Sequence, residues 1–296
     1  MKKITFALLS TALTAGLLAG CGGGKETESP APTATPSPTA SAPAGSETVQ
    51  YQDGKYYAEA AEFASSGWKE AVALTVEGGK ITDVYWTALN KDGGIDKRVY
   101  SEQGKYGMKA GGASSEWHEQ AEKAEQYLIQ IQDPSAIELN AEGKTDAIAG
   151  VTVHVNGLFD LAKQALEAGP VVEAGPYKDG HYHAEQDDFG SSGWKSTVDL
   201  TVLNGKIYAV RWSGVNADGE DKFEYSKEGK YGMKEKGNAT AEWHEQALKA
   251  EQYLLEKQDP AAITLKEDGK TDAIAGVTIN LSEFVELASK ALEQAK

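Results

Sequence analysis

The amino-acid sequence predicts an α+β fold built from two tandem duplicated domains, each an antiparallel sheet with flanking helices. Within each copy, strand-like alternation comes first and helical spacing follows, which favours α+β over a parallel α/β fold. The distance between the two copies of one repeated word, such as SSGWK at residues 65 and 191, corresponds to a complete small domain and not to one unit of a solenoid. The repeated words, in chain order, are SSGWK (65–69, 191–195), GKYGMK (104–109, 229–234), EWHEQA (116–121, 242–247) and GKTDAIAGVT (143–152, 269–278).

The first part of each copy predicts a hairpin of two antiparallel strands. Apolar residues alternate over 72–76 and over 198–202, and a turn follows in each case. Asn204-Gly205 is a strong hairpin signal, and Gly78-Gly79 stands at the same place in the first copy. The returning strands are predicted at 80–86 and 207–212.

Two helices are predicted after the strands. Apolar residues from Trp117 to Ile131 recur at helical spacing, and Asp133-Pro134 ends that helix. Asn280, with Glu283 three residues later, is predicted to form the capping box of the last helix. The final helices of the two copies are predicted at 158–166 and 281–295.

The N-terminus has the features of an exported lipoprotein. Residues 1–20 combine two lysines with a short apolar stretch and a small-residue site, as in a signal peptide. Leu18-Ala19-Gly20-Cys21 resembles a bacterial lipobox, so Cys21, the only cysteine, is the predicted lipidation site. An ordinary signal peptide with a chance cysteine is the alternative. We therefore expect a lipid-anchored protein on the extracellular face of the cell membrane.

Composition divides the rest of the chain. Residues 21–48 are rich in Pro, Thr and Ser and are predicted to be a disordered tether. The two domain copies are assigned to residues 49–169 and 175–296. The net charge of −16 would repel phosphate backbones, so we expect no nucleic-acid partner.

The familiar catalytic motifs are incomplete in this sequence. Gly143-Lys144-Thr145 lacks the earlier glycine of a nucleotide-binding P-loop, because Glu138 occupies that position. His118 lacks the second histidine of a HExxH zinc site and is predicted to be a polar residue on a solvated helix face. His181 and His183 have no counterparts in the first copy. We therefore predict no catalytic residues and no metal site.

The repeated decamer GKTDAIAGVT is the candidate site. Thr152 and Thr278 are predicted just ahead of a helix N-terminus, where free backbone N–H groups bind phosphate well. Gly150 and Gly276 would let the backbone approach such a group closely. A strand-turn-helix corner that merely needs glycine is the structural alternative.

Aromatic and methionine side chains are candidate walls for a planar ligand. Trp68 and Trp194 follow Ser-Ser-Gly segments, and Met108 and Met233 lie in the repeated glycine-containing loop. Core packing is the alternative for the tryptophans.

The decamer resembles the Asp-x-x-Ser/Thr-Gly-Ala-Thr motif of the FMN-binding domain family. The matching segments are Asp146–Thr152 and Asp272–Thr278, with Ala149 and Ala275 at the Ser/Thr position and Val151 and Val277 at the Ala position. The resemblance extends over nearly all of each copy and includes Tyr-x-Asp-Gly-x-Tyr openings at 51–56 and 177–182.

This resemblance implies one FMN in each copy, joined through its phosphate to Thr152 or Thr278 by an extracellular FMN transferase that recognises Asp146 or Asp272. Gly150, Gly276, Val151 and Val277 would complete the cofactor-binding motif. A lipobox, a tether and two such domains are similar to the lipoproteins of Gram-positive flavin-based extracellular electron transfer. The resemblance thus implies an electron carrier more than a substrate-specific enzyme. Its donor would be a membrane quinol or an NADH-dependent oxidoreductase, and its acceptor ferric iron or another extracellular oxidant.

Two hypotheses from other classes stay open. A flavin-free surface lipoprotein could use the same acidic domains to bind cell-wall polymer or a partner protein. Release of the signal fragment that ends at Gly20 as a peptide pheromone is a further hypothesis.

Overall fold

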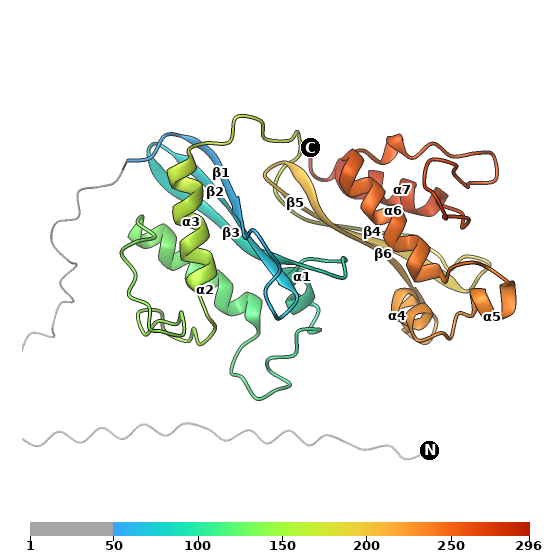
Figure 1. The fold of residues 1–296 in the computed structure, drawn as a ribbon, viewed down its shortest axis with the longest axis horizontal. Coiled ribbons are helices and arrows are strands. Elements are labelled where there is room, and N and C mark those ends of the chain that lie inside the picture. The colour runs from blue at the N-terminus through green and yellow to red at the C-terminus, as the bar shows by residue number, and fades with distance from the viewer. Residues whose placement is uncertain (1–49) are drawn as a thin grey trace, which may run out of the picture. The chain divides into compact units, whose positions relative to one another are not determined.

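The structure is a computed structural model that describes residues 50–296, in which one α+β arrangement occurs twice (Figure 1). Each occurrence has a three-stranded antiparallel sheet with helices packed on it, so the predicted fold class is confirmed. The predicted signal peptide, the lipidation site Cys21 and the tether lie outside the described residues.

In each sheet, strands that follow one another in the chain are also hydrogen-bonded neighbours. The predicted hairpins are present, with Val72 opposite Trp86 and Val198 opposite Trp212. Both returning strands continue past their predicted ends because their last residues pair with the first residues of the preceding strand. The first sheet contains β1 (Gly54–Glu59), β2 (Trp68–Glu77) and β3 (Lys80–Asn90), and the second contains β4 (Gly180–Glu185), β5 (Trp194–Leu203) and β6 (Lys206–Asn216).

Helices follow the strands in each copy. The first copy has α1 (Lys97–Glu102), α2 (Trp117–Ile131) and α3 (Asn156–Ala168). The second has α4 (Lys222–Lys227), α5 (Met233–Gly237), α6 (Trp243–Lys257), a short 3₁₀ turn (Pro260–Ala262) and α7 (Ser282–Glu293). The short helices α1, α4 and α5 are absent from the sequence-based prediction, because elements of this length show too little apolar periodicity.

The capping box predicted for the last helix is wrong. The N-cap of α7 is Leu281, and Asn280 Oδ1 instead accepts a hydrogen bond from Ser282 N at 2.8 Å. Capping boxes are found at the start of α2, between Glu116 and Glu119, and at the start of α6, between Glu242 and Glu245. Glutamate is a less common N-cap residue than Ser, Thr, Asp or Asn, so the pattern is easily missed.

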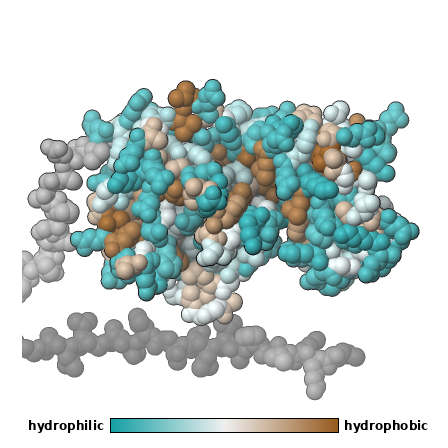
Figure 2. Space-filling model, in the orientation of Figure 1, coloured by the Kyte–Doolittle hydropathy of each residue, from teal (hydrophilic) through white to brown (hydrophobic). Residues whose placement is uncertain are grey.

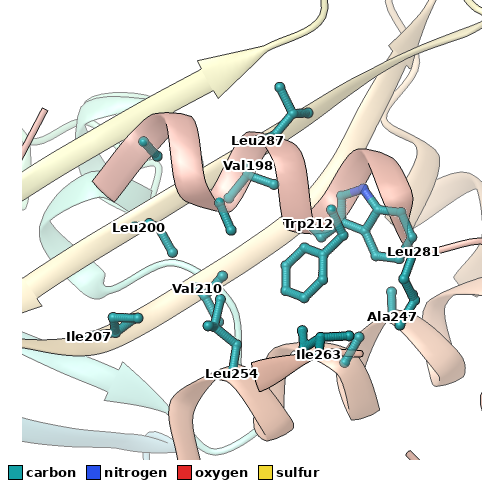
Figure 3. Close-up of a cluster of buried hydrophobic side chains, with 14 of the residues drawn as sticks. Val198, Leu200, Ile207, Val210, Trp212, Ala247, Leu254, Ile263, Leu281 and Leu287 are labelled. Atoms are coloured by element: carbon teal, nitrogen blue, oxygen red, sulfur yellow. The ribbon is translucent and has the colours of Figure 1, made fainter. Parts of the chain in front are cut away.

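The hydrophobic core of each copy lies between its sheet and its two long helices. In the first copy α2 packs on β3 and α3 packs on β1 and β2, and α6 and α7 are placed in the same way in the second. The Trp86 and Trp117 ring centroids lie 4.9 Å apart in the first copy. Trp212 and Trp243 have the same separation in the second copy. Figure 3 shows the second core, labelled at Val198, Leu200, Ile207, Val210, Trp212, Ala247, Leu254, Ile263, Leu281 and Leu287.

The face shown in Figure 2 is mainly polar. Hydrophilic side chains cover most of the face in Figure 2, with apolar groups scattered among them. The large apolar side chains exposed within residues 50–296 are Phe63, Val172 and Phe189. None of the helices in this part of the chain has the length and apolar character needed to cross a membrane.

Candidate functional site

The repeated decamer forms the same loop in both copies, with every third residue from Thr145 and from Thr271 buried. Thr145, Ile148 and Val151 are buried, whereas Asp146, Gly150 and Thr152 are exposed. The matching residues of the second copy are divided in the same way: Thr271, Ile274 and Val277 are buried, and Asp272, Gly276 and Thr278 are exposed. Val151 and Val277 therefore contribute their side chains to the core and only their backbone to the loop surface.

A tight turn presents the two decamer glycines. Val151 N donates to the Ile148 carbonyl at 3.2 Å, and the second copy makes the same bond. Gly150 and Gly276 both have a φ of 76°, the left-handed value required at the third residue of a type II turn. The conformation of the turn is therefore enough to require glycine at these positions, as expected for a corner of the chain that has no ligand.

A buried glutamine holds each candidate threonine in place. Gln120 on α2 is 1% exposed, and its Oε1 accepts hydrogen bonds from Thr152 N (2.7 Å), Val153 N (3.2 Å) and Thr152 Oγ1 (3.3 Å). Gln246 on α6 makes the same set with Thr278 N (2.7 Å), Thr278 Oγ1 (3.2 Å) and Ile279 N (3.3 Å). The sequence analysis missed both glutamines, although they lie in the repeated EWHEQA word and that repetition was the available signal.

Replacement of Gln120 by leucine is expected to destabilise the first copy by about 2 kcal/mol, because Thr152 N and Val153 N lose their acceptor. Urea unfolding and amide hydrogen exchange at Thr152 and Val153 measure the effect, with exposed Gln126→Leu on the same helix as the control. Unchanged exchange at both amides in Gln120→Leu would show that the glutamine does not hold the loop.

A carboxylate lies at the helix end that follows each decamer. Glu70 of β2 places its carboxylate against Gly157 in the first turn of α3, so close that a side chain on Gly157 would collide with it. In the second copy Glu283 stands in the first turn of α7 itself. A helix N-terminus stabilises negative charge. The helix end at which the sequence predicts a phosphate seat thus already carries an acid, which would repel a phosphate.

A buried lysine faces this acid in each copy. Lys97 is 8% exposed, and its Nζ lies 4.4 Å from the Trp117 ring centroid. Lys222 is 6% exposed, with its Nζ 4.5 Å from the Trp243 ring centroid. Burial lowers the pKa of both lysines to about 8, and the nearby carboxylate, Glu70 or Glu283, opposes that shift. Burial likewise raises the pKa of Glu70, against the effect of Lys97.

The carboxylate comes from a strand in the first copy and from a helix in the second. Glu70 corresponds to Ser196 in the second copy, and Gly157 corresponds to Glu283, so strand and helix have exchanged the carboxylate. Ser196 Oγ accepts a hydrogen bond from Trp212 Nε1 at 2.8 Å. The matching Trp86 Nε1 has no hydrogen-bond partner within residues 50–296. Each copy thus keeps one carboxylate near its buried lysine, Glu70 near Lys97 and Glu283 near Lys222.

The tryptophans and methionines predicted as ligand walls lie in different elements: Trp68 and Trp194 begin β2 and β5, Met108 lies in the loop before α2, and Met233 begins α5. Trp68 packs against Tyr100 and Tyr106, with centroid separations of 5.8 and 6.4 Å. Met108 N donates to Glu116 Oε2 at 3.0 Å, and its side chain packs against the core. In the second copy Trp194 packs against Tyr225 and Tyr231, and Met233 N bonds to Glu242.

The histidines are held in hydrogen bonds. His118 is half-buried and shares a 3.0 Å hydrogen bond with Ser101, so its predicted place on a solvated helix face is wrong; α1, which the sequence did not predict, covers it. His181 and His183 both contact Asp199 Oδ1 at 3.0 Å. Burial would raise the pKa of Asp199, but the hydrogen bonds from both histidines lower it to about 2. No set of side chains within residues 50–296 has the make-up of a metal site.

A shallow cavity of about 870 Å³ adjoins the exposed side of the first decamer. Its walls are the outer face of α2, including Lys123 and Tyr127, and decamer residues Ala147, Ile148 and Ala149. Trp68 and Met108 are not among its lining residues.

No family model and no curated protein matches the chain. A solution NMR structure of a Clostridium thermocellum protein is 56% identical over 40% of this chain and 91% of that protein, with a TM-score of 0.33. A crystal structure of a Clostridium perfringens protein is 27% identical over 40% of this chain and 88% of its own, also with a TM-score of 0.33. The chain is thus similar in sequence to clostridial proteins whose descriptions state no activity.

Proposed function

We propose that this protein is a membrane-anchored extracellular flavoprotein that carries FMN on Thr152 and Thr278 and transfers electrons. The observation that carries the proposal is the duplicated threonine. In each copy an exposed threonine lies in an identical loop, and a buried glutamine holds both its backbone and its hydroxyl. Since the copies differ at many other positions, identical loops with exposed hydroxyls favour a shared chemical role.

The residues around Thr152 fit an FMN joined through its phosphate. Thr152 is exposed, and Lys123 Nζ lies over the neighbouring Gly150. Tyr127 and Ile129 in the adjoining cavity would offer ring and apolar contacts to a flat group. When bound, the flavin would supply the one- and two-electron redox chemistry, and the chain would supply attachment, orientation and access.

The remaining parts of the proposal come from the sequence. A transferase would recognise Asp146 and Asp272, which are both exposed. Lipidation at Cys21 and a Pro-rich tether would keep the domains near a membrane quinol or NADH-dependent donor while letting them reach ferric iron or another acceptor. A covalent bond would prevent loss of the cofactor outside the cell.

Co-expression with an FMN transferase, followed by denaturation, tests the proposal. We expect flavin fluorescence that stays with the polypeptide, and an intact mass that shows two FMN adducts. Thr152→Ala and Thr278→Ala should each remove one adduct, and the double variant should remove both. Thr145→Ser is the matched control, because this buried decamer threonine lies outside the attachment position. Colourless parent protein would contradict the proposal and favour a flavin-free module that binds cell-wall polymer or a partner protein.

A further inference from the structure

We propose that Lys123 on α2 and Lys249 on α6 each form an anion subsite beside the decamer threonine, a subsite that takes the phosphate of a phosphomonoester. Its role toward FMN rests on the proposed function, but binding of phosphate at this place does not.

The two lysines lie directly over the decamer glycines. A methyl group placed on Gly150 would come within 2.9 Å of Lys123 Nζ, and one placed on Gly276 within 2.6 Å of Lys249 Nζ. Each ammonium group therefore contacts the surface of the turn at an exposed glycine, two residues before the exposed threonine. Both copies place the ammonium group in the same way.

The helix face that holds the threonine also positions the lysine. Gln120 and Lys123 are three residues apart on α2, as Gln246 and Lys249 are on α6, and side chains at this spacing share one face of a helix. The glutamine binds the backbone of Thr152 and the lysine covers Gly150. One helix face thus places a hydroxyl and a cation on the same loop.

The acids that could neutralise these lysines have other partners. Glu119 and Glu122 line the cavity with Lys123, but Glu119 pairs with Lys109 at 2.7 Å and Glu122 pairs with Arg98 at 3.0 Å. In the second copy Glu245 pairs with Lys234 at 2.7 Å, and Leu248 stands where the first copy has Glu122. Neither lysine forms an ion pair with any of residues 50–296. In a chain with a net charge of −16, two such cations at equivalent places are suited to an anionic ligand.

The alternative phosphate position is unfavourable. A carboxylate lies at the helix N-terminus after each decamer, because Glu70 of β2 lies against Gly157 of α3 and Glu283 stands in the first turn of α7. The lysine lies on the exposed side of the turn and offers a point charge with three N–H donors, which suits a terminal phosphate. The geometry therefore favours the lysine over the helix end as the phosphate partner.

Titration of the purified full chain with inorganic phosphate, at constant ionic strength kept with chloride, tests the subsite. We expect saturable amide NMR shifts at Gly150 and Gly276. Lys123→Gln should abolish the shift at Gly150 and leave that at Gly276, and Lys249→Gln should do the reverse. Lys163→Gln, an exposed lysine on α3, is the control and should change neither. Absence of the shifts in the parent, or equal shifts in Lys123→Gln, would overturn the inference.

Flavin loading separates this inference from the proposed function. In a Thr278→Ala background only the first copy can be loaded, and Lys123→Gln should slow the gain of one FMN mass about tenfold, the expected effect of losing one charge-assisted hydrogen bond. No loading of the Thr278→Ala parent would contradict the proposed function, while the phosphate titration would still decide the subsite. Normal loading of Lys123→Gln would overturn its role toward FMN.

Discussion

Replacement of Gly157 by glutamate is expected to destabilise the first copy by about 3 kcal/mol or more when made alone, and to be tolerated when Glu70 is replaced by serine in the same chain. Alone, the new side chain collides with the Glu70 carboxylate and places a second negative charge beside it. Together, the two changes reproduce the arrangement of the second copy, in which Glu283 supplies the acid and Ser196 stands in the strand.

The single Glu70→Ser variant completes a double-mutant cycle with the parent, Gly157→Glu and the double variant. It removes the negative charge that faces Lys97, which costs stability, but it also offers a hydroxyl to the unpartnered Trp86 Nε1. We expect a net loss of about 1 to 2 kcal/mol at pH 7. The double variant should lie within about 1 kcal/mol of the parent, which gives a coupling energy of about 3 kcal/mol or more.

Urea unfolding of the four proteins measures the cycle. Asp83→Ser, on an exposed part of β3, is the control for the loss of one acid from the sheet. If the two single effects simply add in the double variant, the proposed exchange of the carboxylate between strand and helix is contradicted.

The second large effect concerns pH. Lys97 and Lys222 have a pKa of about 8 in the folded protein against a usual value of 10.5. Between these values the unfolded chain binds more protons than the folded one, so stability increases as pH rises through this window. From pH 7.5 to 9.5 the free energy of unfolding should increase by about 1 to 2 kcal/mol for each lysine.

The control for this prediction is the Lys97→Met/Lys222→Met double variant, which should lose most of the increase. The measurement stops at pH 9.5 to avoid the ionisation of tyrosine. Burial raises the pKa of Tyr57 and Tyr208 in the folded protein, so these residues lower the free energy of unfolding only when the pH exceeds the usual tyrosine value of 10.0. Equal pH dependence in the parent and in the double variant would show that the buried ammonium groups are not its source.

Local signals account for the success of the sequence-based fold prediction. The alternation over 72–76 and the Asn204-Gly205 turn specify hairpins within a few residues, and the spacing from Trp117 to Ile131 specifies a helix. The short helices α1, α4 and α5 carry too few residues for such a signal. The failed capping box at Asn280 reflects a similar limit, because a side chain that bonds two residues ahead and one that caps a helix use the same residue types.

By itself, the sequence determined the duplication, one hairpin and the two long helices of each copy, and the decamer as the candidate site, since identical words and local periodicity need no knowledge of distant contacts. Only the tertiary structure decided which side chains meet the decamer. Gln120 lies 32 residues before Thr152 and reaches it because α2 packs beside the loop. The placement of Lys123 over Gly150, and the exchange of the acid between Glu70 and Glu283, likewise depend on elements brought together by burial of the core. Hydrophobic burial acts between residues far apart in the chain, and no local pattern encodes which of their polar neighbours will come into contact.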